Sequence, residues 1–204
     1  MPAEIRRPFV IAGVSVSVAW AVTGLFLSLI PSFVTITLKG NPALAGAVVA
    51  LMLATATVAQ LSGYRFDSHR AQTIGLMIMI FGVVALILPD NTQTLGWLLV
   101  ATVLGGAGMG LAFMGSLGDV NETAPEDRKG DIVASYYVVV YIATAIPAVG
   151  VGALTIATGS SSAIQIFGYA VIALCLGGLA GLFVELQARR HSEPGRPLAD
   201  PSSS

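Results

Sequence analysis

The run LGWLLVATVLGGAGMGLAFMGSL, which spans residues 95–117, contains no charged residue, no histidine and no proline. A helix of about 20 predominantly apolar residues is long enough to cross the hydrocarbon core of a bilayer. The run is therefore predicted to be a transmembrane helix.

Five further runs of the same kind occur at residues 9–37, 43–61, 73–88, 132–157 and 163–186. The chain is 55% hydrophobic and only 10% charged, whereas a soluble domain has about 25% charged residues. So little charge excludes a water-soluble globular domain of this length. The first run is also longer than the core of a signal peptide, so it is expected to be a retained helix. The sequence thus predicts an all-α membrane protein with six transmembrane helices.

The basic residues alternate between the loops. Nine of the ten lie before the first run, in the second and fourth loops, or after the sixth run: Arg6, Arg7, Arg65, Arg70, Arg128, Lys129, Arg189, Arg190 and Arg196. The other three loops contain only Lys39. Because cytoplasmic loops are enriched in Arg and Lys, both termini are predicted to be cytoplasmic, in a multi-pass protein of the bacterial inner membrane. The expected divisions are a cytoplasmic segment at 1–8, a transmembrane domain at 9–186 and a disordered cytoplasmic tail at 187–204.

Several classes of site are not expected. Cys175 is the only cysteine, which rules out an intrachain disulfide and a cysteine-based metal cluster. His69 and His191 fall in polar segments and are expected to be solvated. No Asp, Glu, Lys, Arg or His lies deep within a predicted span, because the five acids of the fourth loop, residues 118–131, fall outside the apolar runs and Glu185 lies at the cytoplasmic end of the sixth run. The sequence predicts no enzyme activity, no metal, no cofactor and no nucleic-acid partner.

One face of the first predicted helix is unusually polar and small. Its members recur at steps of three and four: Gly13, Ser17, Trp20, Gly24, Ser28, Pro31 and Thr35. In lipid such a face must turn toward protein or water. Two interpretations remain open, a close-packing face and a wall of a substrate cavity with Trp20 as its aromatic contact. The cavity candidates on this helix are Trp20, Gly24, Ser28 and Ser32, and Pro31 is expected to bend it.

Glycine, proline and tyrosine mark three other helices. Gly106 and Gly110 form one G-x-x-x-G pair and Gly177 and Gly181 another, which predicts close helix contact. The fifth run contains Pro147 and Gly150, which favour a bendable helix. Its residues Tyr137 and Tyr141 share a face and are further candidates for the cavity wall, although packing is an equal alternative; Tyr136 is expected at the membrane interface.

The loop SGYRFDSHR at residues 62–70 resembles the signature loop of the major facilitator superfamily. Gly63, Asp67 and Arg70 match that signature, whereas Ser68 replaces its basic residue and its second glycine is missing. Residues 125–152, with Glu126, Arg128, Gly130 and Pro147, are similar to the loop and following helix in the second half of the drug-efflux branch. Residues 24–32, followed by the run NPALAG, are similar too, so that the resemblance covers about residues 9–186.

The resemblance implies half of a major facilitator fold, six helices arranged as two three-helix repeats and matching the C-terminal half. It implies secondary transport by alternating access, with efflux of small amphipathic compounds through the lipid bilayer. A second six-helix half, a copy of this chain or a separate one, would complete the transporter. Gly63, Asp67, Arg70 and Arg128 would form a latch on the cytoplasmic side. The alternative is a non-transporting membrane scaffold, or a remnant of a transporter gene.

Overall fold

The computed structural model describes residues 17, 20, 23, 24, 34, 42–87, 95–158 and 160–191. Within them lie five long helices and one short 3-10 helix: α2 (Pro42–Gly63), α3 (Ser68–Ile87), α4 (Leu95–Thr123), η2 (Glu126–Arg128), α5 (Lys129–Thr158) and α6 (Ser160–His191). Ser17, Trp20, Thr23 and Gly24 of the first segment are also helical. Among the first-segment candidates, Ser28, Pro31 and Ser32 lie outside the described residues.

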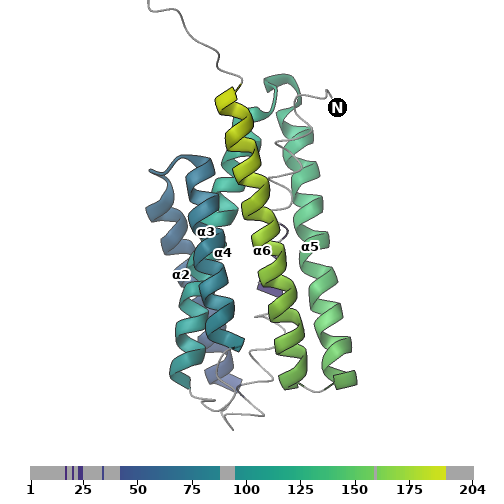
Figure 1. Ribbon diagram of the computed structural model, residues 1–204. Coiled ribbons are helices and arrows are strands. Elements are labelled where there is room, and N and C mark those ends of the chain that lie inside the picture. Colours follow the sequence, from purple (N-terminus) through teal and green to yellow (C-terminus); the bar gives the residue numbers. More distant parts are fainter. Residues whose placement is uncertain are drawn as a thin grey trace, which may run out of the picture.

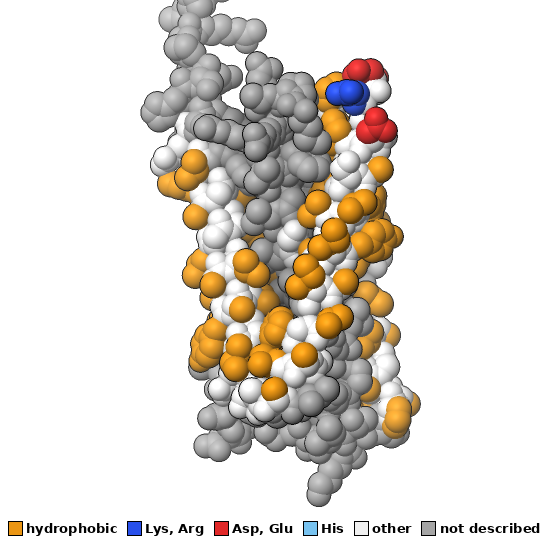
Figure 2. Space-filling view, turned by 90° about the vertical axis from the view of Figure 1, so that its right-hand side faces the viewer, with side chains coloured by type: hydrophobic (Ala, Val, Ile, Leu, Met, Phe, Trp, Pro, Cys, Tyr) orange, Lys and Arg blue, Asp and Glu red, His pale blue; other side chains and the backbone are white. Residues whose placement is uncertain are grey.

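The helices coincide with the predicted apolar runs. Five segments within the described ranges are long and apolar enough to cross a membrane: Pro42–Gly63, Ser68–Ile87, Leu95–Thr123, Glu126–Ile146 and Gln165–Val184. They confirm five of the six predicted spans, and the sixth, at residues 9–37, lies largely outside the described part of the chain. One face of the bundle has the surface expected of a membrane-spanning protein: apolar side chains cover its length, and charged side chains gather at one end (Figure 2).

The charged end, which we call the loop end, also contains the connections from α2 to α3 and from α4 to α5 (Figure 1). The first connection is a tight turn, in which the Phe66 amide donates to the Gly63 carbonyl at 2.9 Å. Asp67 then starts α3, since its carbonyl accepts the Ala71 amide at 2.9 Å. In the second connection Pro125, with φ −58°, leads into η2. Proline suits this place because its fixed φ is compatible with a first helical turn.

Helix α4 is the centre of the bundle. It packs against α2 and α3, while α6 packs against α3 and α5 (Figure 1). In α4, 61% of the most apolar window is buried, compared with 17% in the span that begins at Glu126. The glycines of α4 explain how two helices fit so closely around it.

One row of α4 glycines faces α3 and another faces α2. A Cβ atom added at Gly108 would lie 2.7 Å from both the Gly75 carbonyl oxygen and the Met79 amide nitrogen of α3. On the other side, Cβ atoms at Gly106 and Gly110 would collide with the Met52 and Ala56 carbonyls of α2. The backbones therefore approach at distances that only glycine allows.

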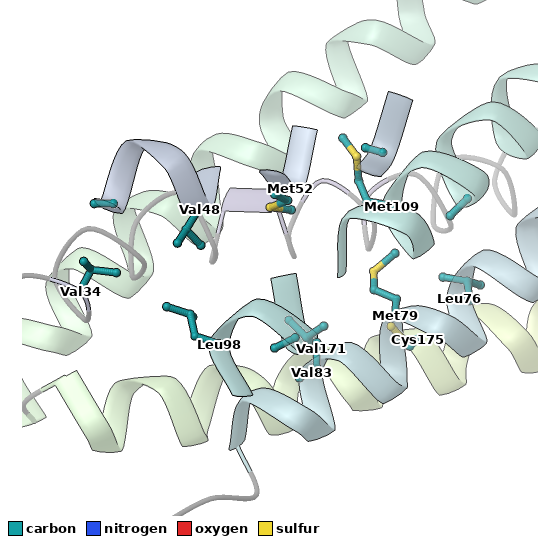
Figure 3. Close-up of a cluster of buried hydrophobic side chains, with 14 of the residues drawn as sticks. Val34, Val48, Met52, Leu76, Met79, Val83, Leu98, Met109, Val171 and Cys175 are labelled. Atoms are coloured by element: carbon teal, nitrogen blue, oxygen red, sulfur yellow. The ribbon is translucent and has the colours of Figure 1, made fainter. Parts of the chain in front are cut away.

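A cluster of apolar side chains fills the space between these helices (Figure 3). It combines Val48 and Met52 of α2, Met79 of α3, Met109 of α4 and Cys175 of α6. Val34 and Trp20 of the first segment contact the same cluster. The first segment thus packs into the bundle at these residues.

Three expectations about the helices are wrong. Helix α4 extends to Thr123, six residues beyond the predicted end, because polar side chains in its last turns have partners on α3. Helix α6 extends to His191, so residues 187–191 of the predicted disordered tail are helical. Gly177 has no described atom within 4 Å of an added Cβ, whereas a Cβ added at Gly178 would lie 3.2 Å from the Leu76 Cδ1 of α3.

Candidate functional site: an aromatic row and a buried polar end

Trp20 lies inside the bundle, between two apolar clusters. Its ring meets Phe113 of α4 edge to face, with centroids 5.7 Å apart and an interplanar angle of 84°. The indole Nε1 is buried and has no hydrogen-bond partner among the described residues. A buried donor without an acceptor costs about 1–3 kcal/mol, and a bound molecule with an acceptor would recover that cost.

The aromatic contacts continue from α4 to α5. The ring centroids of Phe113 and Tyr136 lie 6.5 Å apart. The Tyr136 and Tyr137 rings meet edge to face, with centroids 5.8 Å apart. The hydroxyl groups of Tyr136 and Ser116 are hydrogen-bonded at 2.7 Å. Trp20, Phe113, Tyr136 and Tyr137 form what we call the aromatic row, which crosses from the first segment over α4 to the exposed face of α5.

The second feature is a set of polar contacts between α3 and α4 at the loop end. Ser68 donates a hydrogen bond to Glu122 at 2.9 Å. One helical turn deeper, the Gln72 Nε2 donates to a carboxylate oxygen of Asp119. Gln72 is fully buried and Asp119 is 8% exposed, and the Gln72 Oε1 has no partner among the described residues. The loop end thus contains a buried acid inside a candidate membrane span.

His69 joins α3 to α6. Its Nε2 lies 3.1 Å from the Leu182 carbonyl, so the neutral ring donates there when it carries its proton on Nε2. The side chain is 6% exposed. The expectation of a solvated histidine is wrong, because the helix starts at Ser68 and turns this residue toward α6.

The profile of the Major Facilitator Superfamily matches residues 3–148, well over half of the chain. The chain belongs to the major facilitator superfamily. No curated protein matches it. Members of this superfamily are membrane transporters and not enzymes, and the all-helical bundle described above is half of their fold.

The latch candidates of this facilitator chain lie together only in part. Gly63 is buried against α4, and an added Cβ would lie 2.5 Å from the Leu111 Cδ2. Asp67, Arg70 and Arg128 are exposed. Within the described ranges no ion pair joins these three side chains, so their charges face outward at the loop end.

The cavity candidates divide into two groups. Trp20 and Gly24 face inward, and Gly24 is buried. Tyr137 is 37% exposed at the end of the aromatic row, whereas Tyr141 is 71% exposed and has no ring contact within the described part of the chain. Pro147 lies within the continuous helix α5. A Cβ added at Gly150 would lie 3.2 Å from the Phe167 Cζ of α6.

Tyr136, which the sequence analysis assigned to the membrane interface, is fully buried inside the bundle, where its hydroxyl group contacts Ser116 of α4. Its helical neighbours Ile132 and Val140, four residues away on either side, are buried with it. That spacing is the signal that could have identified the inward face of α5. The partners on α4, Phe113 and Ser116, gave no comparable signal, because they lie in a run that is apolar or small on every side.

Proposed function

We propose that this facilitator chain is one half of a secondary transporter that exports small amphipathic compounds by alternating access. The aromatic row carries the proposal. It offers stacking surfaces and an unpartnered indole N–H in the interior, a combination that suits a flat, partly apolar substrate with a hydrogen-bond acceptor. A membrane scaffold would have no use for a buried donor without an acceptor.

A second six-helix half, either another copy or a separate chain, would close the pathway. The exposed face of α5 supports this arrangement, because Tyr137 and Tyr141 at one end of it give way to apolar residues such as Ile146 and Val149. Tyrosine combines an apolar ring with a polar hydroxyl, which suits a surface shared by substrate, water and a facing half. The exposed Asp67, Arg70 and Arg128 would latch the two halves at the loop end.

Fluorescence of Trp20 tests substrate binding. The chain has two tryptophans, and the other, Trp97, is 47% exposed. In a Trp97→Phe variant, ethidium, an amphipathic aromatic cation, is expected to quench Trp20 emission in a saturable manner, because stacking brings it against the indole ring. The matched Trp20→Phe variant retains only Trp97 and should show the weak, non-saturating quenching of a dye dissolved in lipid. Equal quenching of both variants would contradict a site at Trp20.

The orientation is tested by cysteine accessibility in a Cys175→Ser background. The loop end contains Arg65, Arg70, Arg128 and Lys129, so it should face the cytoplasm. Cysteine at the exposed Ser162, near the start of α6, is expected to react with a membrane-impermeant maleimide on intact cells. Cysteine at the exposed Phe66 should react only after the cells are opened. Labelling of Phe66→Cys on intact cells would reverse the proposed orientation.

A further inference from the structure

The contacts of Ser116 determine where the Tyr136 hydroxyl places its proton. The Ser116 Oγ donates to the Phe113 carbonyl at 3.0 Å and lies 2.7 Å from the Tyr136 Oη. A serine hydroxyl has a single proton, so both hydrogen bonds form together only when Tyr136 donates to Ser116. The reverse direction would leave the O–H of the fully buried Tyr136 without an acceptor among the described residues, which is unfavourable.

A tyrosine oxygen that donates its proton can still accept a hydrogen bond through its lone pairs. No described residue other than Ser116 is hydrogen-bonded to the Tyr136 Oη, so this capacity is unused within the described part of the chain. The oxygen lies close to Phe113, because Ser116 and Phe113 are neighbours on one face of α4 and are themselves hydrogen-bonded. Tyr136 thus supplies the aromatic row with a hydrogen-bond acceptor.

Trp20, the other ring in contact with Phe113, supplies the opposite group. Its buried Nε1 has no hydrogen-bond partner among the described residues, and an indole N–H donates but cannot accept. Phe113 is only half-buried, which leaves part of its ring accessible. One phenyl ring is therefore flanked by a donor on Trp20 and an acceptor on Tyr136.

The apolar surroundings make these two atoms selective. Tyr136 shares its buried cluster with Val120, Ile132 and Val140, and Trp20 packs against the same cluster. A hydrogen bond is stronger in such surroundings than in water. A ligand without the matching group leaves the protein atom unpaired, and sites built in this way discriminate strongly against it.

We propose that the aromatic row selects flat substrates that carry both a hydrogen-bond acceptor and an N–H or O–H donor. The ring system of the substrate lies against Phe113, its acceptor binds the Trp20 Nε1–H, and its donor binds the Tyr136 Oη. A fused aromatic ring system that includes a carbonyl and an N–H has this chemistry. The inference rests on the proposed function, because it names the substrate class of the same site.

A matched pair of ligands tests the proposal. Acridone has a ring carbonyl and a ring N–H, whereas anthraquinone has a second carbonyl in place of the N–H. With the Trp97→Phe variant of the full chain in lipid nanodiscs, acridone is expected to reach half-maximal quenching of Trp20 at an about fivefold lower concentration than anthraquinone, the usual effect of one neutral hydrogen bond. Equal midpoints for the two ligands would overturn the proposal.

Two tyrosine variants in the same background identify the partner of the substrate donor. Tyr136→Phe lacks the acceptor, so acridone and anthraquinone should bind it equally well. Tyr137→Phe is the matched control on the same helix and should retain the difference between the ligands. A difference that persists in Tyr136→Phe, or that disappears in Tyr137→Phe, would overturn the assignment to Tyr136.

Ser116→Ala keeps the test decisive if Tyr136→Phe does not fold. Without the Ser116 Oγ, the Tyr136 O–H is free to donate to the second carbonyl of anthraquinone. Anthraquinone should then bind more tightly and the difference from acridone should narrow; an unchanged difference would overturn the proposal.

The same titrations separate this inference from the proposed function. Saturable quenching by both ligands without any preference would overturn the inference alone. Absence of saturable quenching by acridone, anthraquinone and ethidium alike would overturn the proposed substrate site, and the inference with it.

Discussion

Replacing Gly108 with alanine is expected to lower the free energy of unfolding by about 1–3 kcal/mol, the usual cost of overpacking. The new Cβ would lie 2.7 Å from two backbone atoms of α3, the Gly75 carbonyl oxygen and the Met79 amide nitrogen. Backbone atoms cannot turn away as the end of a flexible side chain can. The two helices must therefore separate, and the cluster around Met79 and Met109 would lose contacts.

Gly177→Ala is the matched control for that experiment. It changes the same atoms on an exposed face of α6, where no described atom lies within 4 Å of the added Cβ. Alanine is favoured over glycine inside a helix by about 1 kcal/mol, so this variant should be neutral or slightly more stable. The stability of both variants is measured from the loss of the helical circular dichroism signal as detergent-solubilised protein is titrated with SDS. Equal stability of the two would mean that α3 and α4 do not approach each other as closely as the structure indicates.

The apolar runs predicted the helices because crossing lipid depends on length and polarity, which a sequence displays directly. The ends of the helices were less predictable. From the positions of the charged residues, the fourth span was predicted to end at Leu117. The helix instead continues through Asp119 and Glu122, because these side chains have hydrogen-bond partners on α3, Gln72 and Ser68. Those partners are about 50 residues away in the chain, a separation that no local pattern reveals.

The candidate site shows the same limit. Trp20 was identified because a large aromatic residue is out of place in a face of small ones, and it lies inside the bundle. Tyr141, selected by its spacing from Tyr137, is exposed, while the neighbouring Tyr136 holds the contact with α4. Spacing along one helix gives the members of a face, but the direction of that face depends on how the other helices pack around it.

Transport by this chain is expected to require a second half. In the superfamily, substrate sites lie between two six-helix halves that rock against each other, and a single bundle has nothing to rock against. Liposomes containing the purified chain as a demonstrated monomer, with an imposed proton gradient, should therefore accumulate no more ethidium than empty liposomes do. Concentrative uptake by the monomer would contradict this expectation.

A tandem fusion of two copies tests whether the second half is another copy of this chain or a separate chain. An even number of spans would return the chain to the side on which it started, so two copies joined by a flexible linker could insert in the same orientation, as the two halves of these transporters do. If the second half is another copy, the fusion should accumulate ethidium, and Trp20→Ala in both copies should abolish the uptake. If only a separate chain completes the transporter, the fusion should remain inactive even though saturable quenching of Trp20 shows that it binds the dye. Inactivity together with an absence of saturable quenching would favour the scaffold alternative, because a scaffold needs neither a substrate nor a facing half to move against.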